Sequence, residues 1–111
     1  MVFFDFNDAR LSARAQEILA EISASAGYHN PAVIQIEGHD DASQTTERAQ
    51  TISQRRADAV AEALVRLGWP LDRMRIAAFG KTRLLVPTPD GVREPQNRRV
   101  EITLRLQAEA R

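Results

Sequence analysis

The sequence predicts an α+β fold, a two-layer sandwich in which two main helices lie on one face of a mixed four-stranded sheet. Two amphipathic runs with apolar residues three and four positions apart indicate the helices, and four runs of alternating polarity indicate the strands. These runs follow one another in the order β-α-β-α-β-β. With 111 residues and 43% hydrophobic content, the chain is expected to form a single domain over residues 1–111 around one core.

The beginning of the chain is expected to form a strand and then a helix. Residues 2–6 alternate in polarity as a strand with one buried face does. The apolar stripe over residues 11–22 predicts a helix, with Ser12 or Asn7 as the capping residue at its start. Residues 27–31 carry its stop signals, a glycine followed by an asparagine-proline pair.

The middle of the chain supplies the second strand and the second helix. Residues 33–37 alternate as a strand, and Gly38 allows a close backbone approach where that strand ends. The second helix is expected to begin in the segment 43–46. Gly68 is a natural stop for this helix, and Trp69 is positioned to fold back on its last turn.

The last part of the chain is expected to hold two more strands. Residues 74–78 alternate, with Ile76 among the inward positions, and residues 99–106 alternate over a longer run. The segment 80–96 is rich in proline and carries an Asp-Gly pair, so it predicts an exposed loop. Residues 107–111 are expected to be a frayed tail.

The composition excludes several classes of function. Fifteen basic residues balance fifteen acidic ones, which argues against a nucleic-acid binder that works through bulk charge. The absence of cysteine removes disulfides and thiolate metal sites, and we expect no metal and no cofactor. No run is long and apolar enough to span a membrane, so this segment is expected not to insert into one directly.

One arginine stands where the second helix should be apolar. Arg56 lies in the middle of the stripe that faces the core, and a buried guanidinium needs an anionic partner. The acidic pair Asp40-Asp41 ends the preceding strand, and Arg98 is in phase with the inward residues of the last strand. These side chains are expected to converge at one edge of the sheet. Either a ligand completes the charge balance there, or Arg56 bridges helix and sheet through Asp41 without one.

Three sequence blocks, at residues 38–41, 52–60 and 97–102, resemble the OmpA-like peptidoglycan-binding domain. That family includes the C-terminal domain of outer-membrane protein A, the peptidoglycan-associated lipoprotein and the periplasmic part of flagellar stator proteins. The resemblance spans nearly the whole chain, and the three blocks have the family's order and separations. It implies a noncatalytic domain, which anchors a larger cell-envelope protein to the cell wall.

The resemblance also implies a ligand and its site. In the family an aspartate and an arginine hold the zwitterionic end of meso-diaminopimelate in the peptidoglycan stem peptide, and these correspond to Asp41 and Arg56. The third block adds Arg98. Asp40, Asn97 and Ala49 are supporting positions, although Asn97 is more consistent with a structural role. An ammonium on Asp41 and a carboxylate in the fork of Arg56 would form a two-point grip that lysine does not reproduce.

Three positions depart from the family pattern. The family has threonine where Asp40 stands, glycine where Gln44 stands and asparagine where Ala49 stands. The change at Ala49 removes about one hydrogen bond to the ligand, on the order of 1 kcal/mol. The added charge of Asp40 is expected either to favour the ammonium or to pair with Arg48 or Arg98.

An alternative to cell-wall binding is an OmpA-like interaction or dimerisation domain with weak or no peptidoglycan affinity. A homodimer is compatible with both. A small enzyme lacks support, since His39 has no partner histidine nearby and no nucleophile and base share a plausible site. We expect a periplasmic domain cut from a longer protein, attached to the outer or inner membrane through parts absent from this chain.

Overall fold

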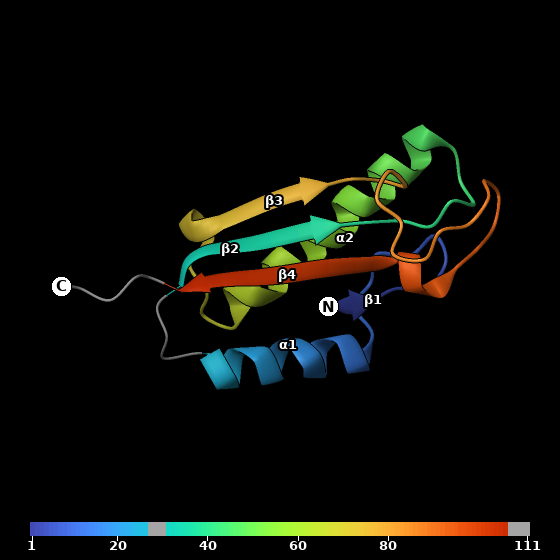
Figure 1. Cartoon of the computed structure of the whole chain (residues 1–111). Coiled ribbons are helices and arrows are strands. Elements are labelled where there is room, and N and C mark those ends of the chain that lie inside the picture. Colours follow the sequence, from blue (N-terminus) through green and yellow to red (C-terminus); the bar gives the residue numbers. More distant parts are fainter. Residues whose placement is uncertain (27–30, 107–111) are drawn as a thin grey trace.

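The computed structural model describes residues 1–26 and 31–106, so the expected stop signals at 27–30 and the tail at 107–111 lie outside the described residues. Within this part the sheet has the strand order β1-β4-β2-β3. The strands are β1 (Val2–Phe3), β2 (Pro31–Gly38), β3 (Met74–Ala78) and β4 (Arg99–Leu106). β2 and β3 are parallel, whereas β4 runs antiparallel to β1 and β2, so the sheet is mixed as predicted (Figure 1).

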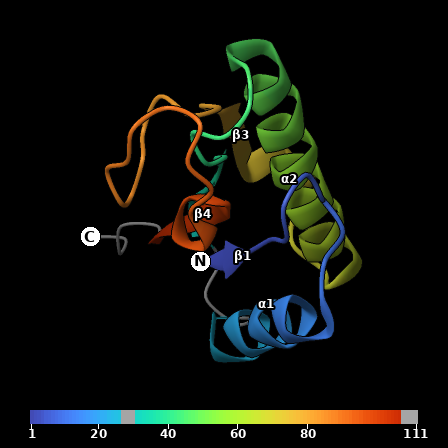
Figure 2. The ribbon, with the colours of Figure 1, turned by 90° about the vertical axis from the view of Figure 1, so that its right-hand side faces the viewer.

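The helices α1 (Ala13–Ala26) and α2 (Thr46–Arg66) cover one side of the sheet, and the loop between β3 and β4 lies on the other side (Figure 2). Ser12 caps α1, because its Oγ accepts from the backbone N–H of Ala15 at 3.0 Å. Thr45 caps α2 in the same way, which confirms the predicted start of that helix. Two short 3₁₀ helices, η1 (Leu71–Arg73) and η2 (Pro95–Asn97), precede β3 and β4.

The end of α2 also follows the prediction. Gly68 adopts φ +100°, a conformation that favours glycine. The chain then turns back, so that the N–H of Trp69 donates to the carbonyl of Leu64 at 3.0 Å and the indole is buried. This turn closes the helix.

Two sequence expectations were wrong in detail. β1 ends at Phe3 instead of Phe6, because the backbone turns away from the sheet through Asn7, whose φ is 54°. Ile76 was expected to be inward but is 38% exposed. It lies on β3, which is the edge strand, and α2 covers that edge incompletely.

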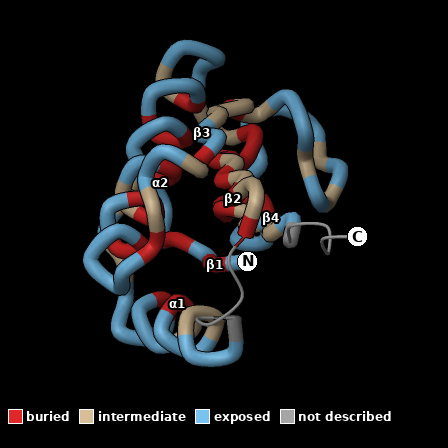
Figure 3. Tube along the Cα trace, turned by 90° about the vertical axis from the view of Figure 1, so that its left-hand side faces the viewer, coloured by how far each residue is buried: buried red, intermediate tan, exposed pale blue. Residues whose placement is uncertain are grey.

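The core lies between the sheet and the helices, where buried residues line the side of α2 that faces the sheet (Figure 3). Gly38 ends β2 under α2 at a point where the two backbones almost touch. A Cβ on Gly38 would overlap the carbonyl oxygen of Ser53. The absence of a side chain at Gly38 therefore sets the distance between α2 and the sheet.

We expect Gly38→Ala to lower the free energy of unfolding by about 3 kcal/mol or more. This is the upper end of the range usual for overpacking, because a helix backbone has to move. Gly91→Ala is the matched control, since a Cβ there meets nothing within 4 Å and only its left-handed φ of +87° opposes it, at about 1 kcal/mol. Urea unfolding of both variants measures the difference. Equal losses would contradict this account of Gly38.

His39 follows Gly38 and is buried beneath the β3–β4 loop. Its ring stacks on Phe79 at 5.5 Å between centroids, and its Nε2 lies 3.7 Å from a carboxylate oxygen of Glu101. Burial lowers the pKa of His39 to about 4, helped by the positive charges of Arg99 and Arg83 and opposed by Glu101. His39 is therefore neutral in the folded protein at pH 7.

The low pKa of His39 makes stability depend on pH. The unfolded chain takes up this proton near pH 6.5 and the folded one only near pH 4, so stability is complete above pH 6.5 and declines as the pH falls toward 4. We expect a loss on the order of 1–3 kcal/mol across this window. Urea unfolding at several pH values should show it, and His39→Gln should remove that part of the pH dependence. An identical pH profile for the variant would refute the assignment.

Candidate functional site

The candidate site lies where β2 ends, and distant parts of the chain meet there. The segment that joins β1 to α1, the residues that follow β2, the middle of α2 and the start of β4 all contribute. Because α2 crosses directly over Gly38, Arg56 on its buried face is placed beside the acidic pair that follows β2. The predicted convergence of charged residues at one edge of the sheet is therefore present.

Arg56 forms the innermost ion pair of this site. Its Nη1 lies 2.9 Å from Oδ1 of Asp40, and both side chains are fully buried. The other bonds go to backbone carbonyls, from Nη1 to His39 at 3.0 Å, from Nε to Asp8 at 2.9 Å and from Nη2 to Asp5 at 3.0 Å. Burial lowers the pKa of Arg56 and the bond to Asp40 opposes this, but an arginine stays protonated at neutral pH.

Asp41 forms a second ion pair, with Arg98. Arg98 Nη1 lies 3.0 Å from Oδ2 of Asp41, and Arg98 Nε donates to the carbonyl of Phe4. The same carboxylate accepts from the N–H and the hydroxyl of Ser43 and from the N–H of Glu94. Burial alone would raise the pKa of Asp41, but these hydrogen bonds outweigh it and hold the pKa below its usual range.

The pairing of acids and arginines differs from the sequence expectation. Arg56 bridges helix and sheet through Asp40, not through Asp41, and Asp40 pairs with neither Arg48 nor Arg98. The reason is that successive side chains on extended backbone point in opposite directions, so the two acids reach different arginines. All four charged groups are brought together, and each acid has its own partner.

The supporting positions have different roles. Asn97 is buried and exchanges two hydrogen bonds with the backbone of Val86, at 2.8 and 2.9 Å, which fixes the β3–β4 loop. These two bonds give Asn97 a structural role in the loop. Ala49 is buried in the first turns of α2 and offers the site no polar group.

Sequence reasoning missed the partner of Arg48, which was considered as a possible partner of Asp40. Its Nε and Nη2 donate to Oδ1 of Asn7 at 3.0 and 2.7 Å, although the two residues are 41 positions apart. This contact ties the β1–α1 segment to the first turns of α2. The positive φ of Asn7 presents its side chain to Arg48, and no local pattern in the sequence signals such a contact.

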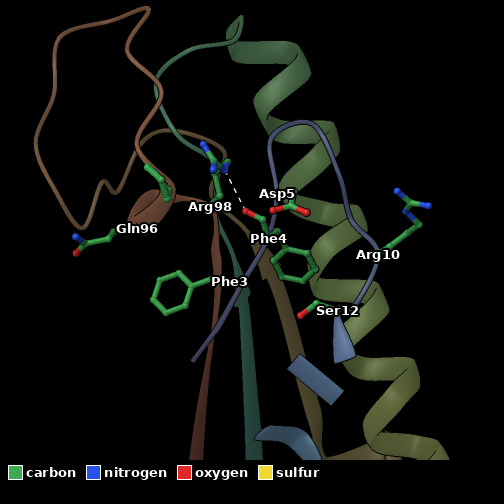
Figure 4. Close-up of a pocket in the computed structure, with 8 residues that line it drawn as sticks. Phe3, Phe4, Asp5, Arg10, Ser12, Gln96 and Arg98 are labelled. Carbon is green, nitrogen blue, oxygen red and sulfur yellow. Dashed lines mark hydrogen bonds between the residues drawn. The ribbon is translucent and has the colours of Figure 1, made fainter. Parts of the chain in front are cut away.

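Beside the two ion pairs there is a cavity of about 310 Å³ (Figure 4). It is lined by Phe3, Phe4, Asp5, Arg10, Ser12, Pro95, Gln96 and Arg98. The side chain of Arg98 is 11% exposed, whereas those of Asp40, Asp41 and Arg56 are not exposed at all. Arg98 therefore lies between the buried charges and this cavity. Its hydrogen bond to the carbonyl of Phe4 is the dashed line in Figure 4, and both residues line the cavity.

The chain resembles known envelope proteins in sequence. A family model described as the OmpA family matches residues 3–98. An outer membrane protein of Gluconacetobacter diazotrophicus is 39% identical over 110 residues, which cover 94% of this chain and 29% of that protein. A peptidoglycan-associated lipoprotein of Legionella pneumophila is 34% identical over 104 residues, which cover 91% of this chain and 57% of the lipoprotein. The chain thus spans less than two thirds of the length of these relatives.

Solved structures agree with the fold. The peptidoglycan-associated lipoprotein of Burkholderia pseudomallei has a TM-score of 0.78 at 29% identity, covering 94% of this chain and 88% of the other. The C-terminal domain of Helicobacter pylori MotB has a TM-score of 0.81 at 18% identity, covering 96% and 84%, and this likeness concerns the fold alone. The OmpA-like proteins among these matches are noncatalytic binding and structural proteins. The chain is a member of the OmpA family, with the noncatalytic character of that family.

Proposed function

We propose that this domain binds peptidoglycan through the meso-diaminopimelate of the stem peptide and so anchors a larger cell-envelope protein to the cell wall. The OmpA family match and the relatives named peptidoglycan-associated lipoprotein support the cell wall as the partner. The observation that carries the proposal is the group of two acids and two arginines at the end of β2.

The chemistry of the ligand suits this group. Diaminopimelate presents an ammonium and a carboxylate on one carbon. The ammonium would bond to Asp41 and the carboxylate would enter the fork of Arg56, with Arg98 beside them. A zwitterion that enters replaces one internal acid and one internal base, so no net charge is added to a buried site. That matters because a buried charge without a partner costs several kcal/mol.

The ligand has to reach side chains that are fully buried in the ligand-free structure. Arg56 donates two of its hydrogen bonds to the carbonyls of Asp5 and Asp8, in the segment between β1 and α1. The residues between them are exposed, so opening this segment breaks the contact between Asn7 and Arg48 but costs little apolar packing. The cavity beside Arg98 provides room for the rest of the stem peptide.

The proposal places the domain in the periplasm, attached to a membrane through other parts of its protein. An outer membrane protein and several lipoproteins among the relatives support this location. Among the described helices, none has the length and apolar character needed to cross a membrane.

The main test is an NMR titration of the domain with a stem peptide that carries meso-diaminopimelate, beside the same peptide with L-lysine. The lysine peptide lacks the second carboxylate. We expect saturable shifts at Asp41, Arg56 and Arg98 with the first peptide only, since a two-point grip needs both groups. No shifts with either peptide would replace this proposal with the interaction or dimerisation domain, which sedimentation at increasing concentration would test.

Arg56→Lys should weaken binding to isolated peptidoglycan at least about tenfold, because lysine keeps the charge but loses the bidentate fork. The neighbouring Arg55→Lys is the matched control, since Arg55 is exposed on the far side of α2. Cosedimentation with peptidoglycan gives the affinities, and circular dichroism verifies that both variants fold. Equal binding by the two folded variants would remove Arg56 from the site.

A further inference from the structure

We infer that Asp40, held in place by Gln44, is an internal competitor for Arg56 and sets the affinity of the site. This inference rests on the proposed function and adds a regulating element to the same site. A carboxylate already occupies the guanidinium to which the ligand carboxylate would bind. The ligand therefore has to displace Asp40 before it reaches Arg56.

The contacts of Arg56 show why Asp40 is the partner that yields. A guanidinium has five N–H donors, and four of the Arg56 donors are used in the described structure. Three acceptors are backbone carbonyls, which cannot leave without a movement of the main chain. Asp40 is the one side-chain acceptor among these four, so rotation about its own bonds is enough to free one N–H of Nη1.

Gln44 holds the competing carboxylate from the other side. Its Nε2 donates to Oδ2 of Asp40 at 3.3 Å, while Oδ1 accepts from Arg56. The carbonyl of Gln44 in turn accepts from Lys81 Nζ at 2.8 Å, and Lys81 pairs with Asp90 at 3.2 Å. A chain of contacts thus runs from the β3–β4 loop to Arg56 and keeps Asp40 in position.

Asp40 and Gln44 also stand at two of the positions where the resemblance to OmpA-like domains implies other residues, threonine and glycine. In the structure they contact each other, and one of them contacts Arg56. Neither threonine nor glycine supplies a carboxylate or a side-chain amide. The two departures therefore act together on the same guanidinium, instead of being independent surface changes.

This arrangement favours ligands with two charges over simple carboxylates. Asp40 makes a single bond to Arg56, through Nη1, whereas a ligand carboxylate in the fork would make two. A ligand that also offers an ammonium to Asp41 gains a further contact. A simple carboxylate such as acetate gains no such contact and would only exchange one carboxylate for another. The internal competitor lowers all affinities by the same factor, so only the better-matched zwitterion binds measurably.

The test compares the affinities of Asp40→Asn, Gln44→Ala and the wild-type domain for the meso-diaminopimelate stem peptide by calorimetry. Asp40→Asn keeps the shape and removes the competing charge, so we expect at least about tenfold tighter binding. Gln44→Ala leaves every charge in place and only frees Asp40, so a smaller gain of a few fold is expected. Asp58→Asn, on the exposed face of α2, is the control for the loss of one negative charge and should bind as the wild type does.

The outcomes separate the two proposals. Tighter binding by Asp40→Asn and Gln44→Ala, or binding by these variants where the wild type shows none, supports the competitor. Wild-type binding that neither variant improves refutes it and leaves peptidoglycan recognition intact. An equal gain in Asp58→Asn also refutes it, since bulk charge would then be the cause. If no folded variant binds, the proposed function itself is wrong and the inference with it.

Because Asp40→Asn leaves Arg56 without a charged partner, it is the variant at risk of unfolding. Gln44→Ala keeps the ion pair and still tests the inference. The exchange of the Arg56 guanidinium protons with water adds a readout that does not depend on affinity. The protons to follow are those on Nη1, the nitrogen that Asp40 contacts. Their exchange should be faster in Gln44→Ala, because a less firmly held Asp40 releases Nη1 more often, and an unchanged rate would contradict the inference.

Discussion

The buried guanidinium of Arg56 is the constraint on which the rest of this site depends. It binds the carbonyls of Asp5 and Asp8 from one segment, the carbonyl of His39 from another, and the carboxylate of Asp40. A buried charge is tolerated only when such partners surround it. One side chain on α2 therefore holds the start of the chain and the end of β2 in fixed positions.

The second ion pair has a similar role at the edge of the sheet. Arg98 joins the entrance of β4 to the carbonyl of Phe4 and to Asp41, so it connects the first and last strands with the acidic segment. The groups proposed to hold the ligand are thus the same ones that stabilise the ligand-free fold. A zwitterion suits such a site, because it substitutes for internal partners without adding charge.

The β3–β4 loop lies on the side of the sheet away from the helices, and it also contacts the site. Asn97 fixes the loop through Val86, and Lys81 reaches from it to the carbonyl of Gln44. Under the same loop, the neutral His39 lies against Phe79 and near Glu101. The loop therefore contributes both to stability and to the position of the Asp40 carboxylate.

The sequence by itself determined the fold class, the bounds of α2 and β4, and the presence of an arginine on a buried helix face. These features are local, since they follow from periodicity, capping residues and glycine, all of which act within a few positions. The family blocks also identified the acids and arginines that meet at the end of β2.

Only the tertiary structure decided which acid meets which arginine. Arg56 binds Asp8 across 48 positions, and Arg98 binds Asp41 across 57, so these contacts depend on how the whole chain is packed. The same holds for the clamp between Arg48 and Asn7 and for the exposure of Ile76 on an edge strand. Pairing in space follows from strand order and backbone direction, which no local pattern records.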